Sequence, residues 1–419
     1  MNNQKYLAVV GQNLKIPFLF DEAERLGIEI VLFHNSANDA DLKSLYSSVT
    51  KVVRISYDDE NLTKKKVIDE YNERPFNGIM TLFEPLVVLV ADIASELQLP
   101  YFSKECVEIC RNKYKTREAL ADASLNVPAF IHWTTTMNDL ENTSLLYPVV
   151  AKPINGFSSQ GVIRADTKEQ LLIAVDNVKK INEESLKLYT TDQVGVIIEE
   201  FIDGPEYVAE TFSVNGDVYV LSIGYKGNCR GPYFEEGVYV APPELSGDII
   251  SEIEKQVMSA VKAVKIFNGP AHVELRLNSE NKPFVLEIGT RIGGSGVSHF
   301  IVQNSTGINF FKLVFEYAMS IEINREDLCP LTEKRIIGNY IIPIQGSGIF
   351  EKIENMDTVK KMSNILRILE FIEPGCSIRP YPFFSVYPGV ILSQHGSYTD
   401  CFEFYRYLDA NLKLVYKSS

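Results

Sequence analysis

Two glutamates, Glu274 and Glu287, have the setting in this chain that most strongly suggests chemistry. They lie in two apolar, strand-like stretches separated by the short loop NSEN, which is a hairpin signal. If Leu277 pairs with Phe284 in that hairpin, the two glutamates fall opposite each other, with β-carbons about 5 Å apart. Like charges at that spacing repel each other, so a cation is expected between them. Two carboxylates, completed by phosphate oxygens and water, suit Mg²⁺.

A second interpretation of the same hairpin stays open. Strand alternation places His272, Glu274 and Arg276 on one face. That face could simply meet solvent, with Arg276 and Arg291 neutralising the glutamates. A register shift of one residue would also separate the two carboxylates. The magnesium site is therefore a hypothesis that depends on how the strands pair.

A candidate phosphate-binding loop follows the strand-like stretch VVAKP. Lys152 ends that strand, and the loop after it is rich in glycine and serine, including Ser158 and Ser159. Small residues let backbone N–H groups approach phosphate oxygens, and hydroxyls add donors. The spacing is not that of a P-loop. A plain turn remains the alternative.

The stretch IIEEFIDGPEY, residues 197–207, is a candidate nucleotide contact. A strand that leaves a buried sheet here could present backbone groups to a base edge, with Glu206 reaching a sugar hydroxyl. A strand end followed by a Gly-Pro turn is the alternative. Similarly, Glu84 stands between a strand and a helix that has Pro85 in its first turn. It is either a helix cap or a ligand contact at the carboxyl end of a strand.

The order of strand-like and helical stretches predicts an α/β and α+β protein. Residues 1–105 alternate strand and helix, as in a doubly wound parallel domain, but lack a dinucleotide-binding glycine fingerprint. Asn215-Gly216 predicts a tight hairpin turn. Helices are expected at 106–130, at 167–188, at about 247–266 and near 357–371, the last of these in a small C-terminal α+β domain.

Composition excludes several functional classes. The formal net charge of −14 argues against nucleic acid or an anionic membrane as the main partner. No apolar run reaches the length of a bilayer span, and the first residues do not read as a secretory signal, so a cytoplasmic protein is expected. The six cysteines are scattered, without metal-site spacing, as expected for reduced thiols.

Taken together, these motifs resemble the ATP-grasp family of carboxylate–amine ligases over nearly the whole chain. IIEEFIDGPE is similar to the family's hinge segment, HVELRL with VLEIGTRIGG is similar to its metal-binding strand pair, and RNKYKTRE and VVAKP supply lysines upstream. Each motif is moderately specific, and their joint order is strongly specific. The resemblance implies an ATP-grasp fold with an N-terminal α/β domain at 1–105, a helical linker at 106–131, a lid at 132–200, a core with an antiparallel sheet at 201–320 and a C-terminal domain at 321–419.

The resemblance also implies which residues bind ATP and metal. Lys113 and Lys152 would hold the phosphates or adenine N7, Ser158 and Ser159 would lie in the loop over the phosphates, Glu199 with Glu200, Phe201 and Ile202 would contact the adenine, and Glu206 would bind the ribose. Glu274 and Glu287 would hold Mg²⁺, with Mn²⁺ as an alternative. Arg291 would stabilise the transferred phosphoryl group, and the N–H groups of Gly293 and Gly294 could help it to stabilise the later oxyanion.

One position departs from the family pattern E-x-N-x-R. Gly289 replaces the asparagine, which leaves a second metal with one ligand fewer. Within the family the chain most resembles bacterial L-amino-acid ligases, the dipeptide synthetases of the bacilysin-synthetase type. That resemblance implies a substrate pocket formed by Glu84, Pro85, Glu236, Tyr239 and Ser295.

The expected function is therefore ATP-dependent joining of two unprotected L-amino acids through an acyl phosphate, with release of ADP and phosphate. Two alternatives remain: another ATP-grasp ligase or carboxylase acting on a metabolic acid, and a non-catalytic ATP-binding regulator. The expected partners are small-molecule amino acids, without nucleic acid or membrane, and the resemblance allows a homodimer. The sequence does not identify the two amino acids or the base that deprotonates the amine.

Overall fold

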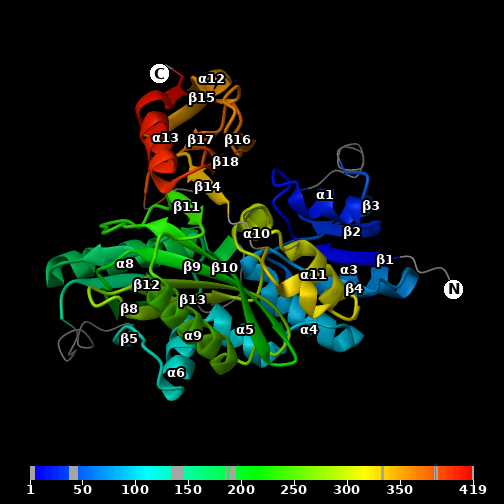
Figure 1. Ribbon diagram of the computed structural model, residues 1–419. Helices are drawn as coiled ribbons and strands as arrows, with labels where there is room; N and C mark the ends of the chain where they lie inside the picture. The colour runs from blue at the N-terminus through cyan, green and yellow to red at the C-terminus, as the bar shows by residue number, and fades with distance from the viewer. Residues whose placement is uncertain are drawn as a thin grey trace.

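The N-terminal region forms a parallel sheet flanked by helices. The computed structural model describes residues 5–36, 46–133, 146–184, 186–188, 195–331, 335–381, 383 and 386–417. The first elements are β1 (Lys5–Val10), α1 (Phe18–Arg25), β2 (Ile28–His34), β3 (Val49–Arg54), α3 (Glu60–Glu73), β4 (Gly78–Met80), the short 3₁₀ turn η1 (Glu84–Leu86) and α4 (Val87–Leu97). The strand order is β3-β2-β1-β4. The strands β1 and β2 are largely apolar and buried, as expected for a parallel sheet with helices packed against it (Figure 1).

Two short helices follow, where the sequence predicts one long helix over 106–130. They are α5 (Lys104–Arg111) and α6 (Lys113–Asp122). Asn112 separates them with non-helical backbone angles, and its side chain accepts a hydrogen bond from the Lys115 N–H. An asparagine cap of this kind competes with helix continuation. The break places Lys113 at the start of a new helix, facing the site described below.

A four-stranded antiparallel sheet carries the candidate phosphate loop. Its elements are β5 (Phe130–Trp133), β6 (Val149–Pro153), β7 (Ile163–Ala165), α8 (Lys168–Glu184), η2 (Leu186–Leu188) and β8 (Val196–Glu200). The strand order is β5-β8-β6-β7, and α8 packs its buried face against this sheet. Lys152 lies on the central strand β6, and the Gly/Ser loop joins β6 to β7. The packed four-stranded sheet therefore fixes both ends of this loop.

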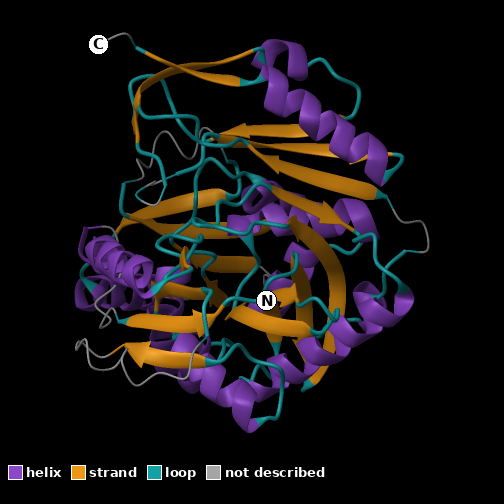
Figure 2. Cartoon of the chain, turned by 90° about the vertical axis from the view of Figure 1, so that its left-hand side faces the viewer, coloured by secondary structure: helices purple, strands orange, loops and turns teal. Residues whose placement is uncertain are grey.

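One eight-stranded sheet runs from the core into the C-terminal region (Figure 2). Its order is β13-β12-β9-β10-β11-β14-β18-β16. The strands are β9 (Glu206–Val214), β10 (Asp217–Gly227), β11 (Val238–Ala241), β12 (Gly269–Leu277), β13 (Pro283–Gly289), β14 (Ile336–Ile341), β16 (Ile365–Glu370) and β18 (Gly389–His395). The boundary expected at 320/321 therefore falls between strands of one sheet, and the set of domain boundaries stays a prediction.

Helices and 3₁₀ turns pack against this sheet and complete the core. They are α9 (Gly247–Ala263), η3 (Gly294–Gly296), α10 (Val297–Thr306), α11 (Phe310–Ala318) and η4 (Arg325–Leu328). The largest buried cluster joins residues of the N-terminal sheet to α10, α11 and the far strands of the eight-stranded sheet. The predicted hairpin turn is confirmed: Asn215 and Gly216 join β9 to β10, both with positive φ.

The predicted helix near 357–371 is wrong. The C-terminal region contains β15 (Gly348–Glu354), α12 (Met356–Val359), β17 (Ser377–Ile378), α13 (Tyr398–Asn411) and β19 (Lys413–Tyr416) beside the large sheet. Only α12 is helical within the predicted range, and Ile365–Glu370 forms the edge strand β16. Pairing with β18 and burial of Leu369 decide the conformation there, because tertiary packing overrides weak local propensity.

The strand register of the β12–β13 hairpin differs from the expected one, but Glu274 and Glu287 still face each other. Leu277 pairs with Pro283, not with Phe284, which itself pairs with Arg276. A β-bulge between Glu274 and Leu275 then restores the alignment, so Glu274 still lies opposite Glu287. Bulges add one residue to one strand and re-aim the side chains beyond it.

Within the described residues, no helix combines the length and apolar character needed to cross a membrane.

Burial of His299 makes stability depend on pH. This α10 residue is buried against Phe311, whose N–H donates to its Nδ1 at 3.1 Å. Desolvation lowers the pKa of His299 to about 4. Because the unfolded histidine binds a proton near its ordinary pKa of 6.5, the contribution of this residue is present above pH 6.5 and is lost as the pH falls toward 4.

We therefore expect the free energy of unfolding to fall by up to about 3 kcal/mol between pH 6.5 and 4 through this residue. Urea unfolding of the wild-type chain and of His299→Leu across that range measures the difference. The variant should show a shallower pH dependence, whatever its absolute stability. Equal slopes in the two proteins would contradict the assignment.

Candidate active site

Both glutamates of the predicted metal pair are held by lysines. Glu274 Oε1 lies 2.6 Å from Lys226 Nζ, and Glu287 Oε2 lies 2.9 Å from Lys113 Nζ. Burial alone would raise the pKa of Glu274, but the charges of Lys226 and His272 outweigh it and hold this pKa well below its usual value. The two carboxylates are therefore not a solvent-facing pair. They are ionised groups in a partly closed site, each matched by a cation of the chain.

Lys226 is the centre of a partly buried carboxylate cluster that the sequence did not reveal. Besides Glu274, its Nζ lies 3.2 Å from both Glu206 and Glu236. Burial and the charge of Glu274 raise the pKa of Glu206, although Lys226 opposes them. The three carboxylates in turn hold the pKa of Lys226 well above its usual value. Lys226 lies at a bulge of β10, between the Tyr225–Tyr207 and Gly227–Glu206 pairs, so simple alternation does not predict its direction.

A carboxylate on the neighbouring strand β9 orients His272. Its Nδ1 lies 2.6 Å from Glu210 Oε1, and its Nε2 lies 3.4 Å from Glu274 Oε1. Glu210 is fully buried and lies directly opposite His272 in the sheet. The histidine thus bridges a buried carboxylate to one of the predicted metal ligands, and it fixes the direction of the Glu274 side chain.

The nucleotide residues predicted from the sequence line one narrow cleft between the two sheets. The lining includes Lys113, Lys152, Ser159, Glu199, Glu200, Phe201, Ile202, Glu206, Glu274 and Glu287. Its volume is about 70 Å³, smaller than the roughly 300–1,000 Å³ of most ligand sites. The cleft in this conformation is therefore smaller than a nucleotide needs.

The Glu199 carboxylate forms ion pairs with two cations of the chain. Its carboxylate lies 2.5 Å from Lys152 Nζ and 2.7 Å from Arg117 Nε, and all three side chains are buried. Desolvation lowers the pKa of Lys152, and the nearby charge of Glu199 opposes that shift. The carboxylate thus holds Lys152 in the cleft. Arg117 was not predicted, because its role depends on a partner far away in the sequence.

A second, larger cavity adjoins the cleft and contains the predicted substrate residues. Its volume is about 480 Å³. It is lined by Ser158, Glu84, Glu236, Tyr239, Arg291, Gly294 and Ser295, and it shares Glu274 and Glu287 with the cleft. Residues of the N-terminal sheet and of the C-terminal region form its remaining walls. Pro85 is buried and Gly293 is backed by His272, and neither lines either space.

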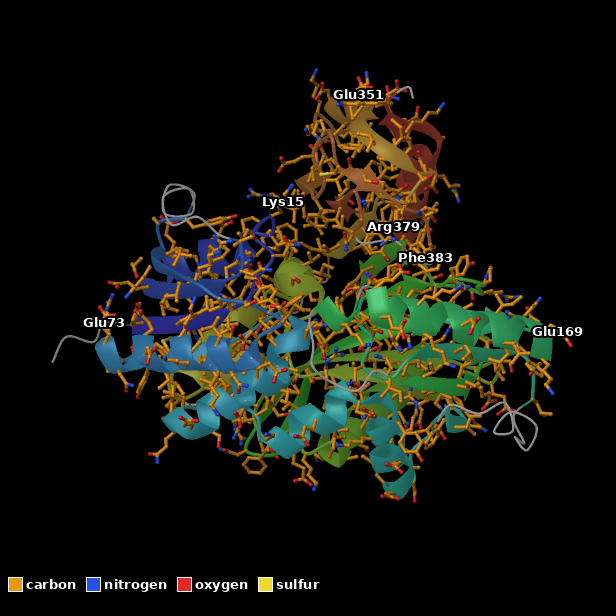
Figure 3. The ribbon with its side chains drawn as sticks, turned by 180° about the vertical axis from the view of Figure 1, so that it is seen from behind. Lys15, Glu73, Glu169, Glu351, Arg379 and Phe383 are labelled. Carbon is orange, nitrogen blue, oxygen red and sulfur yellow. The ribbon has the colours of Figure 1, made fainter. Side chains whose placement is uncertain are left out.

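The N-terminal and C-terminal regions meet beside this cavity. Lys15 Nζ lies 2.8 Å from Glu373 Oε1, which joins the loop after β1 to the segment before β17. Figure 3 shows Lys15 at the edge of the N-terminal domain, on the side that faces the C-terminal domain. Exposed ion pairs contribute little stability, so this pair marks where the regions meet and does not lock them together.

Glu84 and Arg291 form a buried ion pair in the cavity. Arg291 Nε lies 2.5 Å from Glu84 Oε2, and Glu84 is only 4% exposed. Burial would raise the pKa of Glu84, but the charges of Arg291 and Arg111 hold it below its usual value. Glu84 is therefore a site residue that faces Arg291, and a helix-cap role alone does not account for it.

Two glycines leave space that these charged groups occupy. A β-carbon on Gly289 would lie 3.3 Å from Glu84 Oε2, so an asparagine there would crowd the Glu84–Arg291 pair. A β-carbon on Gly293 would lie 2.2 Å from His272 Nδ1, which excludes any side chain without rearrangement. Where the family pattern has an asparagine, this chain thus has Gly289 and a nearby carboxylate, that of Glu84 from the N-terminal region.

The donor set fits a magnesium ion that is shared with a phosphate. Glu274 and Glu287 face each other and supply hard oxygen ligands. Among the described residues, no group of three or more acidic, histidine or cysteine side chains is arranged to hold a metal. A bound Mg²⁺ would take its remaining ligands from phosphate oxygens and water, as is usual for this ion at nucleotide sites.

Comparisons with known proteins agree with this geometry. Residues 145–299 match an ATP-grasp domain, and residues 20–101 match an ATP-grasp N-terminal domain. The crystal structure of an L-amino acid ligase from Bacillus licheniformis is 45% identical, with full coverage of both chains and a TM-score of 0.91. A D-alanine–D-alanine ligase A from Clostridium perfringens is 30% identical over 52% of this chain and 70% of its own length.

Some curated relatives match over less of their length. An uncharacterized protein of Sinorhizobium fredii is 24% identical, and the match spans 72% of this chain but 60% of that relative. The predicted ATP-grasp fold is confirmed by the two domain matches and by the full-length structural match. The chain therefore belongs to the ATP-grasp family.

Proposed function

We propose that this protein joins two unprotected L-amino acids into a dipeptide, using ATP and releasing ADP and phosphate. The main support for the proposal is that the nucleotide cleft adjoins the 480 Å³ cavity, and that Glu274 and Glu287 line both. A phosphoryl group at that junction can meet a carboxylate in the cavity. Full-length similarity to the Bacillus licheniformis L-amino acid ligase supports the choice of substrates.

In the first step, a carboxylate oxygen of one amino acid attacks the γ-phosphorus of ATP. The new O–P bond forms as the bond to the β,γ-bridging oxygen breaks, which gives an acyl phosphate and ADP. This step is mainly a problem of positioning and charge. Lys113 and Lys226 lie beside the two glutamates and can move onto phosphate oxygens, and Arg291 faces the same space. Mg²⁺ on Glu274 and Glu287 would neutralise phosphate charge when bound.

In the second step, the free amine of the other amino acid attacks the acyl carbon. The tetrahedral oxyanion collapses as the C–O bond breaks and phosphate leaves, and the amine nitrogen loses its extra proton. Arg291 and the N–H groups of the following glycines supply donors for the oxyanion. Glu84 is placed to hold an ammonium group of a substrate, because its carboxylate lies in the cavity wall and already binds a cation.

Product analysis tests the proposal directly. The chain is incubated with Mg·ATP and a pool of the twenty amino acids, and dipeptides are identified by mass spectrometry alongside ADP release. We expect ADP and dipeptide in equal amounts. ADP release that requires bicarbonate or a single metabolic acid would instead indicate another ATP-grasp reaction. Nucleotide binding without acid-dependent ADP release would indicate a regulator.

Removal of the Arg291 guanidinium should separate binding from turnover. Loss of one such oxyanion donor typically lowers kcat by about 10²–10³-fold, so we expect Arg291→Ala to bind ADP normally and to turn over at least 100-fold more slowly. Calorimetry and coupled ADP release measure the two effects. Arg325→Ala, which removes an exposed pair with Asp217, is the matched control. Wild-type turnover in Arg291→Ala would refute the role.

The lysine–glutamate pairs predict that metal and nucleotide bind cooperatively. Without Mg²⁺, Glu287 and Glu274 retain Lys113 and Lys226, so fewer cations can reach the phosphates. We expect Mg²⁺ to tighten ADP binding at least about tenfold, which corresponds to 1.4 kcal/mol.

The double variant Glu274→Gln/Glu287→Gln separates this exchange from simple loss of metal. It should bind ADP more tightly than the wild type in EDTA, because its lysines are free, and it should lose the Mg²⁺ effect. Glu280→Gln, an exposed glutamate paired with Lys282, serves as control. Weaker ADP binding by the double variant in EDTA would count against the exchange.

A further inference from the structure

The C-terminal region supplies one wall of the substrate cavity, outside both segments that match ATP-grasp domains. Asn339 and Ile341 on β14, Val390 on β18, and Phe371 and Tyr387 from the segments around β17 all line it. Strands β14 and β18 extend the core sheet through β11, so Asn339, Ile341 and Val390 belong to the same sheet as Glu274 and Glu287.

The side-chain carbonyl oxygen of Asn339 in this wall has no hydrogen-bond partner among the described residues. It pairs through its backbone with Tyr239 on β11 and with Leu392 on β18. Its side chain is directed to the cavity and is only 5% exposed. Among the described residues, its Oδ1 has no hydrogen-bond donor. A buried amide left unpaired is destabilising unless a ligand or water satisfies it.

The surroundings of Asn339 are apolar and carry no free charge among the described lining residues. Ile341 and Val390 belong to the main hydrophobic cluster, and Phe371 packs against it. Two charged residues of the same lining, Glu236 and Lys226, pair with each other at 3.2 Å. A compartment of this kind accepts a neutral side chain of moderate length and offers one amide for hydrogen bonding.

Asn339 shares its face of the sheet with another residue of the cavity wall. Tyr239, directly opposite it on β11, lines the same cavity. Opposed residues of paired strands have β-carbons about 5 Å apart on one face. Asn339 and Tyr239 therefore line the cavity side by side.

We propose that Asn339 determines side-chain specificity, and that this compartment selects a neutral amino acid whose side chain ends in a hydrogen-bonding group, above all a carboxamide. The inference rests on the proposed dipeptide synthesis. A carboxamide can donate to and accept from the asparagine amide at once. A thioether or aliphatic side chain of similar length would leave that amide unpaired, and sites built for hydrogen bonds discriminate strongly against such analogues.

A competition experiment tests the assignment. The wild-type chain receives glutamine and methionine in equal amounts, with glycine as common partner and Mg·ATP, and the dipeptides are quantified by mass spectrometry. We expect glutamine-containing products to exceed methionine-containing products by about tenfold or more, as one hydrogen bond to a buried group predicts. Asn339→Leu should reverse that preference and leave the KM for ATP unchanged.

Asn411→Leu, on α13 and outside the cavity lining, is the matched control and should keep the wild-type ratio. A ratio that Asn339→Leu leaves unchanged would overturn the proposal, as would a wild-type preference for methionine. Equal loss of all products in a folded Asn339→Leu variant would also overturn it. Such a loss would indicate that position 339 acts through its backbone and not through its side-chain amide. Absence of any dipeptide from the wild type would instead refute the proposed function on which the inference rests.

Discussion

Charge compensation inside a closed site is the constraint on which this structure depends. Glu274, Glu287 and Glu84 are carboxylates in or beside buried space, and each faces a cation of the chain. Removing charged groups from water costs several kcal/mol for each ion unless partners and hydrogen bonds replace the water. The carboxylates are therefore compensated by the same lysines and arginine that the proposed reaction needs at the phosphates, so ligand binding would be an exchange of partners.

One eight-stranded sheet, shared by the core and the C-terminal region, holds many of these groups in place. Strand β11 joins the core strands β9 and β10 to β14 and β18, so the cavity has a continuous β-sheet wall. The N-terminal sheet contributes from the other side, where the carboxyl ends of its parallel strands lead into the cavity. Under the proposed function, walls from three regions would shield a reactive acyl phosphate from water better than a site on the surface of one domain.

Sequence reasoning located the groups whose chemistry is local and missed those that depend on distant contacts. The opposition of Glu274 and Glu287 was predicted correctly from a register that is wrong by one residue, because a bulge compensates for the shift. Lys226 was missed, since its direction depends on another bulge. The false helix near 357–371 has the same origin: β16 exists because β18 lies beside it. Patterns within a strand or loop can be read from sequence, whereas bulges and long-range partners follow from the packed fold.

Gly289 shows how a local departure and a distant residue become one feature of the site. Where the family pattern has a possible second-metal ligand, this chain has no side chain, and Glu84 of the N-terminal domain comes within contact distance of the vacant position. Glu84 holds Arg291 there instead of a metal. Under the proposed function, an arriving substrate ammonium would take over Glu84 and release the guanidinium toward the phosphoryl group. Turnover would then depend on the presence of an amino acid, because the residue that stabilises the transferred charge stays paired until a substrate replaces it.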